Sequence, residues 1–398
     1  MPQDAKYALV IALTMIHRDP RVMPQVKSLT SEGWIVDTIG NGQNPAPGVR
    51  DHFALNSPAA WTQSTIGTLL IHGFLPHSLR FKLLASNSVE AEVKARIRAG
   101  KYQLIVFNDL DFVPWIADST TFTSQALSGH IHLDLHEYFP IKVRRDSLYR
   151  RFIASYNVWM RKHIGNRGFT TRSTPVRGIS ELYAEEFGFP TPEVIRNCPP
   201  YTVQDPSAVD PSKIRLLYHG AYNPHRGIYE IVDAMRLVDE RFSMTFMFVG
   251  TKSLIEELKT YAKDLQHRVH FVPAVPMEEI SHFINSYDLE IMFYPPRTTN
   301  LVMALPNKFF EAIQGRLGVI IGDSPMMKEL VDEHGLGLVV NGWSPSDLAA
   351  GINSLTPEQV TSYKRAAHAV AANFSAESER QAFLAIVQSS GEHRTSRD

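Results

Sequence analysis

Short apolar runs alternate with amphipathic stretches along this chain. In the N-terminal half, the runs predicted to be buried strands are Tyr7–Leu13, Trp34–Ile39, Gln103–Phe107 and His130–Leu135. Helical periodicity marks Arg21–Ser31, Val89–Ala99 and Ser147–His163 between or after them. Strands that are apolar throughout and separated by helices are typical of a parallel sheet covered on both faces. This half therefore predicts an α/β domain.

The same alternation resumes after a segment rich in structure breakers, which lies between Asn197 and Lys213. The strands predicted beyond it are Ile214–His219, Met244–Val249, Val269–Val272, Leu289–Phe293, Val319–Ile321 and Leu338–Val340. The predicted helices are Gly227–Val238, Ser253–Leu265, Met277–Ser286, Pro306–Gly315, Met326–Glu333 and Ala376–Gln388. We expect two doubly wound domains, over residues 1–197 and 214–375, joined by a linker at 198–213. A cleft facing the carboxyl ends of both sets of strands is expected between them.

Composition narrows the function classes. With 398 residues and a formal net charge of −1, the chain is long enough for two domains and does not resemble a general nucleic-acid binder. Cys198 is the only cysteine, which excludes an intrachain disulfide and favours a reducing, cytoplasmic location. Neither domain begins with Gly-x-Gly-x-x-Gly, so a nicotinamide dinucleotide site is poorly supported.

The helix start at Ala304–Gly315 has the chemistry of an anion site. Pro306 suits the first helical position, and Asn307, Lys308 and Glu311 follow within two turns. Free N–H groups at such a start attract phosphate. Lys308 and Glu311 share one face, so this face offers a cation for phosphate and a carboxylate for sugar hydroxyls.

Several segments, in order, resemble retaining GT-B glycosyltransferases of family 4 over nearly the whole chain. In that family the C-terminal domain holds a sugar nucleotide and the N-terminal domain holds the acceptor, and the final helix packs back on the N-terminal domain. Residues 376–398 are expected to form that helix and a frayed tail. The segments are His17–Val22, Phe107–Asp111, Asp134–Pro140, Val194–Asn197, His219–Gly227 and Leu305–Glu311. The last of these is the Leu-Pro-Asn-Lys-x-Phe-Glu variant of the family motif.

The resemblance assigns donor roles to the C-terminal domain. Arg226 stands where the family has a basic residue on the diphosphate, Lys308 adds a second positive charge, and Glu311 matches the carboxylate that binds the ribose. The other donor-binding candidates flank the phosphates and the base, and they are Gly220, Gly250, Thr251, Pro273, Ala274 and Asn307. No metal or cofactor is expected beyond the nucleotide-diphosphate sugar, because no Asp-x-Asp motif lies in this domain and the two cations can replace a metal.

In the N-terminal domain the resemblance makes His136 a catalytic candidate, together with Arg226 and Lys308. His136 would contact the transferred sugar or the incoming hydroxyl, and Glu137 would orient it or pair with an arginine. Asp19, Arg21 and Asp109 are acceptor-side candidates. The implied reaction is sugar transfer with retention to a hydroxyl group of a glycan, a lipid-linked acceptor or a small molecule, in polysaccharide, glycolipid or glycoside biosynthesis.

The chain departs from the family pattern at Ala221, where an arginine is common, and at Met303, where a glutamate near the donor sugar is common. A non-catalytic sugar-nucleotide-binding partner of an active transferase therefore stays open. A GT-B-fold sugar-nucleotide epimerase is the other alternative, but it would need carboxylates near the donor sugar, and Met303 weighs against it.

A further feature is the basic segment, defined as residues 142–172, with interleaved aromatic side chains. One alternative is a helix whose aromatic stripe packs on the core and whose charged face is solvated. The other is a surface that rests peripherally on an anionic membrane or holds a phosphorylated acceptor. Its nine basic residues are Lys142, Arg144, Arg145, Arg150, Arg151, Arg161, Lys162, Arg167 and Arg172.

Overall fold

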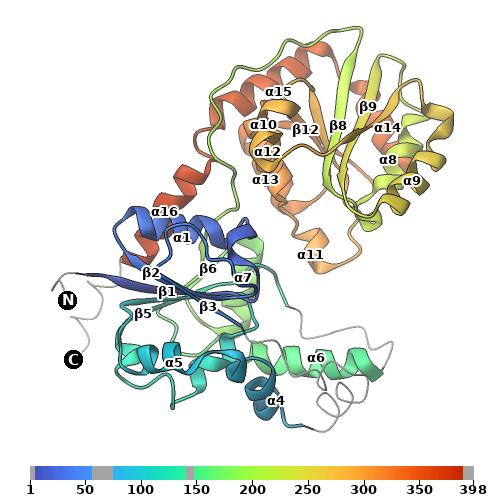
Figure 1. Ribbon diagram of the computed structural model, residues 1–398. Helices are drawn as coiled ribbons and strands as arrows, with labels where there is room; N and C mark the ends of the chain where they lie inside the picture. The colour runs from blue at the N-terminus through green and yellow to red at the C-terminus, as the bar shows by residue number, and fades with distance from the viewer. Residues whose placement is uncertain (1–4, 56–74, 140–147, 389–398) are drawn as a thin grey trace. The chain divides into compact units, whose positions relative to one another are not determined.

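The computed structural model describes residues 5–55, 75–139 and 148–388. The chain divides into two compact units. The N-terminal unit is Met1–Arg196 with Arg380–Asp398, and the C-terminal unit is Asn197–Glu379. Figure 1 shows a sheet flanked by helices in each unit. The predicted tail, 389–398, lies outside the described residues.

The N-terminal unit holds a seven-stranded parallel sheet in the order β3-β2-β1-β4-β5-β6-β7. Its strands are β1 (Tyr7–Ile11), β2 (Ile35–Gly40), β3 (Asp51–Ala54), β4 (Leu104–Asn108), β5 (His130–Asp134), β6 (Thr171–Thr174) and β7 (Glu193–Val194). Its helices are α1 (Val22–Ser31), α4 (His77–Leu84), α5 (Ala91–Arg98), α6 (Leu148–Arg161) and α7 (Arg177–Phe187).

Helix α16 (Ala376–Gln388) returns to the N-terminal unit, which contains it from Arg380 onward. Its Phe383 and Val387 are buried in one cluster with Val22 and Val26 of α1. In Figure 1, α1 and α16 lie on the same face of the sheet, opposite α5. Burying an aliphatic or aromatic side chain of this size contributes roughly 1.5–3 kcal/mol, so these residues hold the helix to the sheet.

The C-terminal unit holds a six-stranded parallel sheet in the order β10-β9-β8-β11-β12-β13. Its strands are β8 (Ile214–Ala221), β9 (Phe242–Val249), β10 (Val269–Pro273), β11 (Leu289–Met292), β12 (Gly318–Gly322) and β13 (Gly337–Val340). Its helices are α8 (Ile228–Met235), α9 (Lys252–Tyr261), α10 (Ile280–Ile284), α11 (Thr299–Val302), α12 (Asn307–Gln314), α13 (Pro325–His334), α14 (Pro345–Ser354) and α15 (Pro357–Val370).

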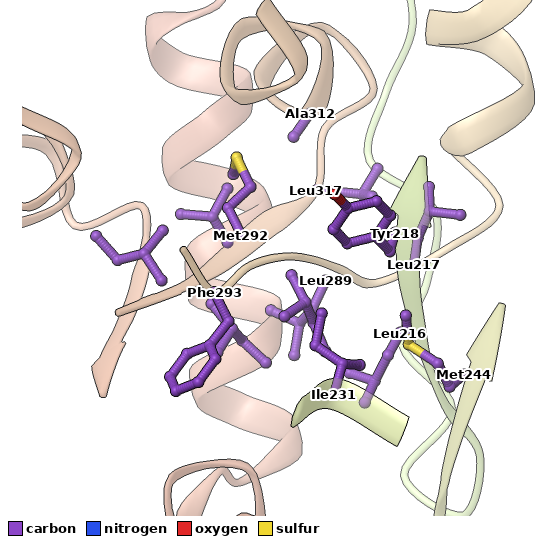
Figure 2. Packing of buried hydrophobic residues seen from close by; sticks show 14 of the residues in the cluster. Leu216, Leu217, Tyr218, Ile231, Met244, Leu289, Met292, Phe293, Ala312 and Leu317 are labelled. Carbon is purple, nitrogen blue, oxygen red and sulfur yellow. The ribbon is translucent and has the colours of Figure 1, made fainter. Parts of the chain in front are cut away.

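The core of the C-terminal unit lies around β8 and β11. Leu216 and Leu217 of β8 pack with Leu289 and Met292 of β11, and the ring of Tyr218 belongs to the same cluster (Figure 2). Strand order reverses between these two strands, and ligands of doubly wound sheets bind at such a switch point. The fold thereby places the ends of β8 and β11 where a ligand site is expected.

The structure differs from the sequence prediction at several elements. Pro306 is the N-cap of α12, with extended backbone, so the helix begins at Asn307 and not at the proline. Met277–Ser286 is divided into a 3-10 turn at Met277–Glu279 and the short helix α10. The elements that the pattern did not predict are β3, β6, β7, α4, α7, α11, α14 and α15.

Candidate functional site

The end of β8 and the loop after it hold two glycines that no other residue can replace easily. Gly220 has φ 109° and Gly227 has φ 71°, in the region that disfavours side chains. A Cβ on Gly227 would overlap the carbonyl oxygen of Phe293 at the end of β11. Between them, Asn223 Oδ1 accepts a hydrogen bond of 2.9 Å from the backbone N–H of His225. This close approach of the loop to β11 positions Arg226 beside the switch point.

Lys308, on the first turn of α12, is a buried cation. Its Nζ lies 3.4 Å from the centroid of the Tyr218 ring and 3.9 Å from Glu290 Oε1. The side chain is only 5% exposed, and Nζ has no hydrogen-bond partner among the described residues. Burial lowers the pKa of Lys308 to about 8, with Glu290 opposing and Arg226 adding to the shift. The ammonium is therefore available to a ligand that brings negative charge.

Arg226 supplies a second cation next to Lys308. Its guanidinium carbon lies 5.4 Å from the centroid of the Tyr294 ring, and its buried Nε makes no hydrogen bond within the part of the chain that the structure describes. Burial raises the pKa of Tyr294 and of Tyr218 above the ordinary value, so both phenols stay neutral. Buried polar atoms without partners are rare in folded proteins, and here they lie on cations that suit phosphate.

Glu311 is held by a chain of charged groups that begins inside the sheet. His219 Nε2 lies 2.7 Å from Glu311 Oε2, and His219 Nδ1 lies 3.0 Å from Glu290 Oε2. Burial alone would lower the pKa of His219, but the two carboxylates outweigh it and raise the pKa to about 9. An imidazolium therefore bridges two carboxylates, of which Glu290 is fully buried and Glu311 is 19% exposed.

The remaining donor candidates lie at the carboxyl ends of neighbouring strands. Gly250 and Thr251 follow β9, while Pro273 and Ala274 lie at the end of β10, and all are exposed. Asn307, the exposed first residue of α12, lies at the helix start. The candidates thus run along one edge of the sheet, from β10 to the β8 loop.

The two departures from the family pattern lie on the same unit. Ala221 is the exposed last residue of β8, and Met303 is the C-cap of the short helix α11.

Acceptor-side candidates of the N-terminal unit surround Asp134 at the end of β5. Arg21 donates hydrogen bonds to both carboxylate oxygens of Asp134, at 2.9 and 2.6 Å, and another to the carbonyl of Ile195. These contacts outweigh the effect of burial and hold the pKa of Asp134 well below its usual range. Asp19 Oδ1 accepts from the backbone N–H groups of Arg21 and Val22, so it closes the start of α1. Arg21 and Asp19 therefore both have internal partners.

His136 and Asp109 lie together beside this ion pair. His136 Nε2 is 3.2 Å from Asn108 Oδ1 and 3.6 Å from Asp134 Oδ2, and the ring is 20% exposed. Asp109 has a positive φ of 62°, and its buried Oδ1 has no hydrogen-bond partner among the described residues. Burial raises the pKa of Asp109 to about 6, against the opposing charge of His136. A positive φ is uncommon for aspartate and often marks a functional site. Glu137 follows His136 and is exposed.

Sequence reasoning missed His219 and Glu290 as site residues. Glu290 is the one acidic residue of an otherwise apolar strand, and a buried carboxylate is retained only when it is paired. His219 occupies a buried position immediately before Gly220. Polar residues inside buried strands were therefore the signal that could have identified both.

The described part of the basic segment has mostly internal contacts. Tyr156 and Trp159 stack at 5.7 Å between ring centroids, and both contact His77 of α4. Arg161 is buried and pairs with Glu186, and Arg172 donates to the carbonyls of Ile164 and Asn166. Lys162 and Arg167 are exposed. Lys142, Arg144 and Arg145, as well as the side chains of Arg150 and Arg151, lie outside the described residues.

Neither a membrane-spanning helix nor a metal cluster was found in the described ranges 5–55, 75–139 and 148–388. No helix there combines the length and apolar character needed to cross a bilayer. No group of three or more histidine, cysteine, aspartate and glutamate side chains there is arranged to hold a metal ion.

Part of the C-terminal unit matches a known protein family. Residues 213–357 match the family model described as Glycosyl transferases group 1. No curated protein matches the chain significantly. The matched residues span the donor candidates from Gly220 to Glu311.

Solved structures resemble the chain over nearly its full length. Sucrose-phosphate synthase from Thermosynechococcus elongatus has a TM-score of 0.69 at 16% identity, covering 95% of this chain and 97% of that one. Anabaena HepE in complex with UDP and glucose has a TM-score of 0.65 at 14% identity, covering 96% and 100%. The α,α-trehalose 6-phosphate synthase from Burkholderia multivorans has a TM-score of 0.61 at 12% identity, covering 97% and 98%. The GT-B fold is thereby confirmed, and the C-terminal unit carries a glycosyltransferase domain.

Proposed function

We propose that this chain is a retaining glycosyltransferase that moves a sugar from a nucleoside diphosphate sugar to a hydroxyl acceptor. The observation that carries the proposal is the pair of cations at the β8–β11 switch point. Lys308 Nζ and Arg226 Nε are buried without hydrogen-bond partners in the described residues, beside the start of α12. A diphosphate would supply both the acceptor oxygens and the negative charge that these groups lack.

The donor would lie along the carboxyl edge of the C-terminal sheet. Glu311 accepts hydrogen bonds from the ribose hydroxyls, Arg226 and Lys308 bind the diphosphate, and Asn307 and the backbone at Gly220 complete the phosphate site. The base lies against Gly250, Thr251, Pro273 and Ala274. HepE was solved with UDP and with UDP-glucose, so uridine nucleotides are the first donors to test.

In the proposed reaction, the bond between the anomeric carbon and the diphosphate oxygen breaks, and the leaving diphosphate takes the electron pair. Arg226 and Lys308 stabilise the charge that develops on it, which is the role of a divalent metal in other phosphate sites. The acceptor hydroxyl attacks the face from which the diphosphate departs. Its proton passes to the leaving diphosphate oxygen, and the configuration at the anomeric carbon is retained.

The acceptor would be held by the N-terminal unit. His136 hydrogen-bonds the transferred sugar or the incoming hydroxyl, with Asp109 and Glu137 beside it. Arg21 and Asp19 complete this side. The acceptor class is a glycan, a lipid-linked glycan or a small molecule, and the product belongs to polysaccharide, glycolipid or glycoside biosynthesis.

A thermal-shift panel of UDP, GDP, ADP, TDP and CDP tests the proposal on the full chain. One nucleotide at a hundred times its dissociation constant should stabilise the protein by roughly 2.7 kcal/mol. The matching nucleotide sugars are then incubated with the protein, and the anomeric configuration of the released or transferred sugar is read by NMR. If no diphosphate raises the melting temperature, or if the configuration is inverted, the proposal fails.

A further inference from the structure

The imidazole of His219 has both nitrogens committed to carboxylates. Nδ1 lies 3.0 Å from Glu290 Oε2, Nε2 lies 2.7 Å from Glu311 Oε2, and the side chain is 1% exposed. Only an imidazolium donates from both nitrogens, so a protonated His219 satisfies the two contacts together. His219 comes from β8, Glu290 from β11 and Glu311 from α12. The chain of contacts therefore ties the start of α12 to the two central strands.

Glu290 is anchored more firmly than an ordinary strand residue. Its Oε1 accepts a hydrogen bond of 3.1 Å from the backbone N–H of His219, and its Oε2 faces the ring of the same residue. It is fully buried, and Lys308 Nζ lies 3.9 Å from its Oε1. A buried carboxylate costs stability unless it is paired and hydrogen-bonded. Glu290 thus serves as a fixed anchor that holds the ring of His219 in place.

Glu311 is the exposed end of this arrangement, since it is the only one of the three residues with appreciable exposure, at 19%. His219 occupies Oε2 from the protein interior, which leaves Oε1 and the remaining lone pair of Oε2 for a ligand. A glutamate side chain without such a contact samples several rotamers, and ordering it on binding reduces affinity. The contact with His219 fixes the carboxylate in advance.

We propose that His219, anchored by Glu290, is a positioning residue that orients Glu311 to accept hydrogen bonds from two neighbouring ribose hydroxyls. The inference rests on the proposed function, because it concerns the same nucleotide site. It adds that recognition of the ribose depends on buried contacts behind Glu311. The pair His219–Glu290 acts through Glu311 and not on the ligand itself.

The experiment compares full-length wild type with His219→Gln and with the double variant His219→Leu/Glu290→Leu. The double variant removes the buried charges together, so it does not leave Glu290 unpaired. Affinities for UDP and for 2′,3′-dideoxyUDP are measured by calorimetry, or for the corresponding pair when another base is preferred. The dideoxy nucleotide lacks both ribose hydroxyls and cannot donate hydrogen bonds to the Glu311 carboxylate. Wild type should therefore prefer UDP by a factor on the order of tenfold or more. Both variants should lose most of that preference, with Glu311→Ala as the reference for complete loss.

A second measurement separates positioning from general damage to the fold. In the Glu311→Ala background, adding His219→Gln should leave the ratio of the two affinities unchanged, because the side chain through which His219 acts is already gone. Preservation of the wild-type ratio in both His219 variants, alongside its loss in Glu311→Ala, would overturn the inference while leaving the proposed function intact. If wild type binds none of the nucleoside diphosphates, the proposed function fails instead, and the inference falls with it.

Discussion

The ammonium of Lys308 lies over the face of the Tyr218 ring, 3.4 Å from its centroid, and this contact with an aromatic face takes the place of a hydrogen bond. A cation over a buried phenol ring is attracted by the ring quadrupole, but its N–H groups are not satisfied. The arrangement keeps a charge inside the C-terminal unit at a cost in free energy. Such an arrangement is typical of a site that is completed by its ligand.

Replacing this ammonium should separate stability from binding. We expect Lys308→Met to leave the free energy of unfolding unchanged or higher by about 1 kcal/mol, because a poorly satisfied buried charge is replaced by an apolar side chain of similar size. Affinity for UDP, or for the diphosphate identified by the panel, should fall by about 10- to 100-fold as a charge-assisted contact is lost. Urea unfolding and calorimetry measure the two quantities.

The matched control for that variant is Lys328→Met on α13. Lys328 is 43% exposed and forms a helical ion pair with Asp332 at 3.0 Å. Exposed pairs of this kind contribute about 0.3–0.5 kcal/mol, so neither quantity should change much. A clear loss of stability in Lys308→Met without a loss of affinity would show that Lys308 is a structural residue.

Gly227 should be the least replaceable glycine of the β8 loop. Gly227→Ala combines an unfavourable φ of 71° with overlap between the new Cβ and the carbonyl oxygen of Phe293. Gly335→Ala is the matched control, because it has a similar φ of 64° and nothing within 4 Å of the new Cβ. We expect the control to lose about 1 kcal/mol of stability from strain alone, and Gly227→Ala to lose at least twice as much. Equal losses in urea unfolding would mean that the loop moves to accommodate a side chain.

Much of the fold was predictable from the apolar runs alone. The central strands of both sheets were identified because parallel strands buried on both faces are apolar along their whole length. The strand β6, Thr-Arg-Ser-Thr, was missed because its side chains are polar and it lies near the edge of its sheet. Helices α14 and α15 were missed although Ser344 with Asp347, and Thr356 with Gln359, form capping boxes that sequence patterns can reveal.

The site was predictable in part, for a different reason. The resemblance provided Arg226, Lys308 and Glu311, which the structure places on one unit around the β8–β11 switch point. It gave no role to His219 or Glu290, because their role depends on contacts between residues 71 and 92 positions apart in the chain. Likewise, the burial of Lys308 could not be read from its place on the helix, since it depends on which face of α12 meets Tyr218.

The pKa values at the donor site predict how nucleotide binding depends on pH. Lys308 faces Glu290, Glu311, Arg226 and Tyr218, and burial lowers its pKa to about 8. The ammonium proposed to bind phosphate is therefore lost as pH rises through 8, whereas the terminal phosphate is already ionised above about pH 7. His219, facing Glu290 and Glu311, loses its proton only near 9.

Affinity for the nucleoside diphosphate should consequently fall between pH 7 and 9, by up to about tenfold per pH unit once Lys308 is deprotonated. Calorimetric titrations at several pH values measure this. Lys308→Arg keeps its charge at all these pH values, so any dependence that it retains belongs to other groups. A wild-type profile that is flat from pH 7 to 9 would contradict the role of Lys308.

The cluster at the end of β4 and β5 should control turnover without controlling donor affinity, because His136 and Asp109 belong to the N-terminal unit and the donor candidates do not. We expect His136→Ala to lower kcat by about 10²- to 10⁴-fold, the range typical of positioned proton-handling groups, with nucleotide affinity nearly unchanged.

Asp109→Asn should lower kcat as well, and it should also change the pH profile. The pKa of Asp109 is raised to about 6 by burial, so wild-type activity should rise as pH increases through 6 and the carboxylate forms. Asp118→Asn is the control, because this partly exposed carboxylate caps its own turn through Thr120 and Thr121 and should leave that limb in place. Initial rates of sugar transfer from pH 5 to 8 measure the effect. A rise through pH 6 that persists in Asp109→Asn would assign the ionisation to another group.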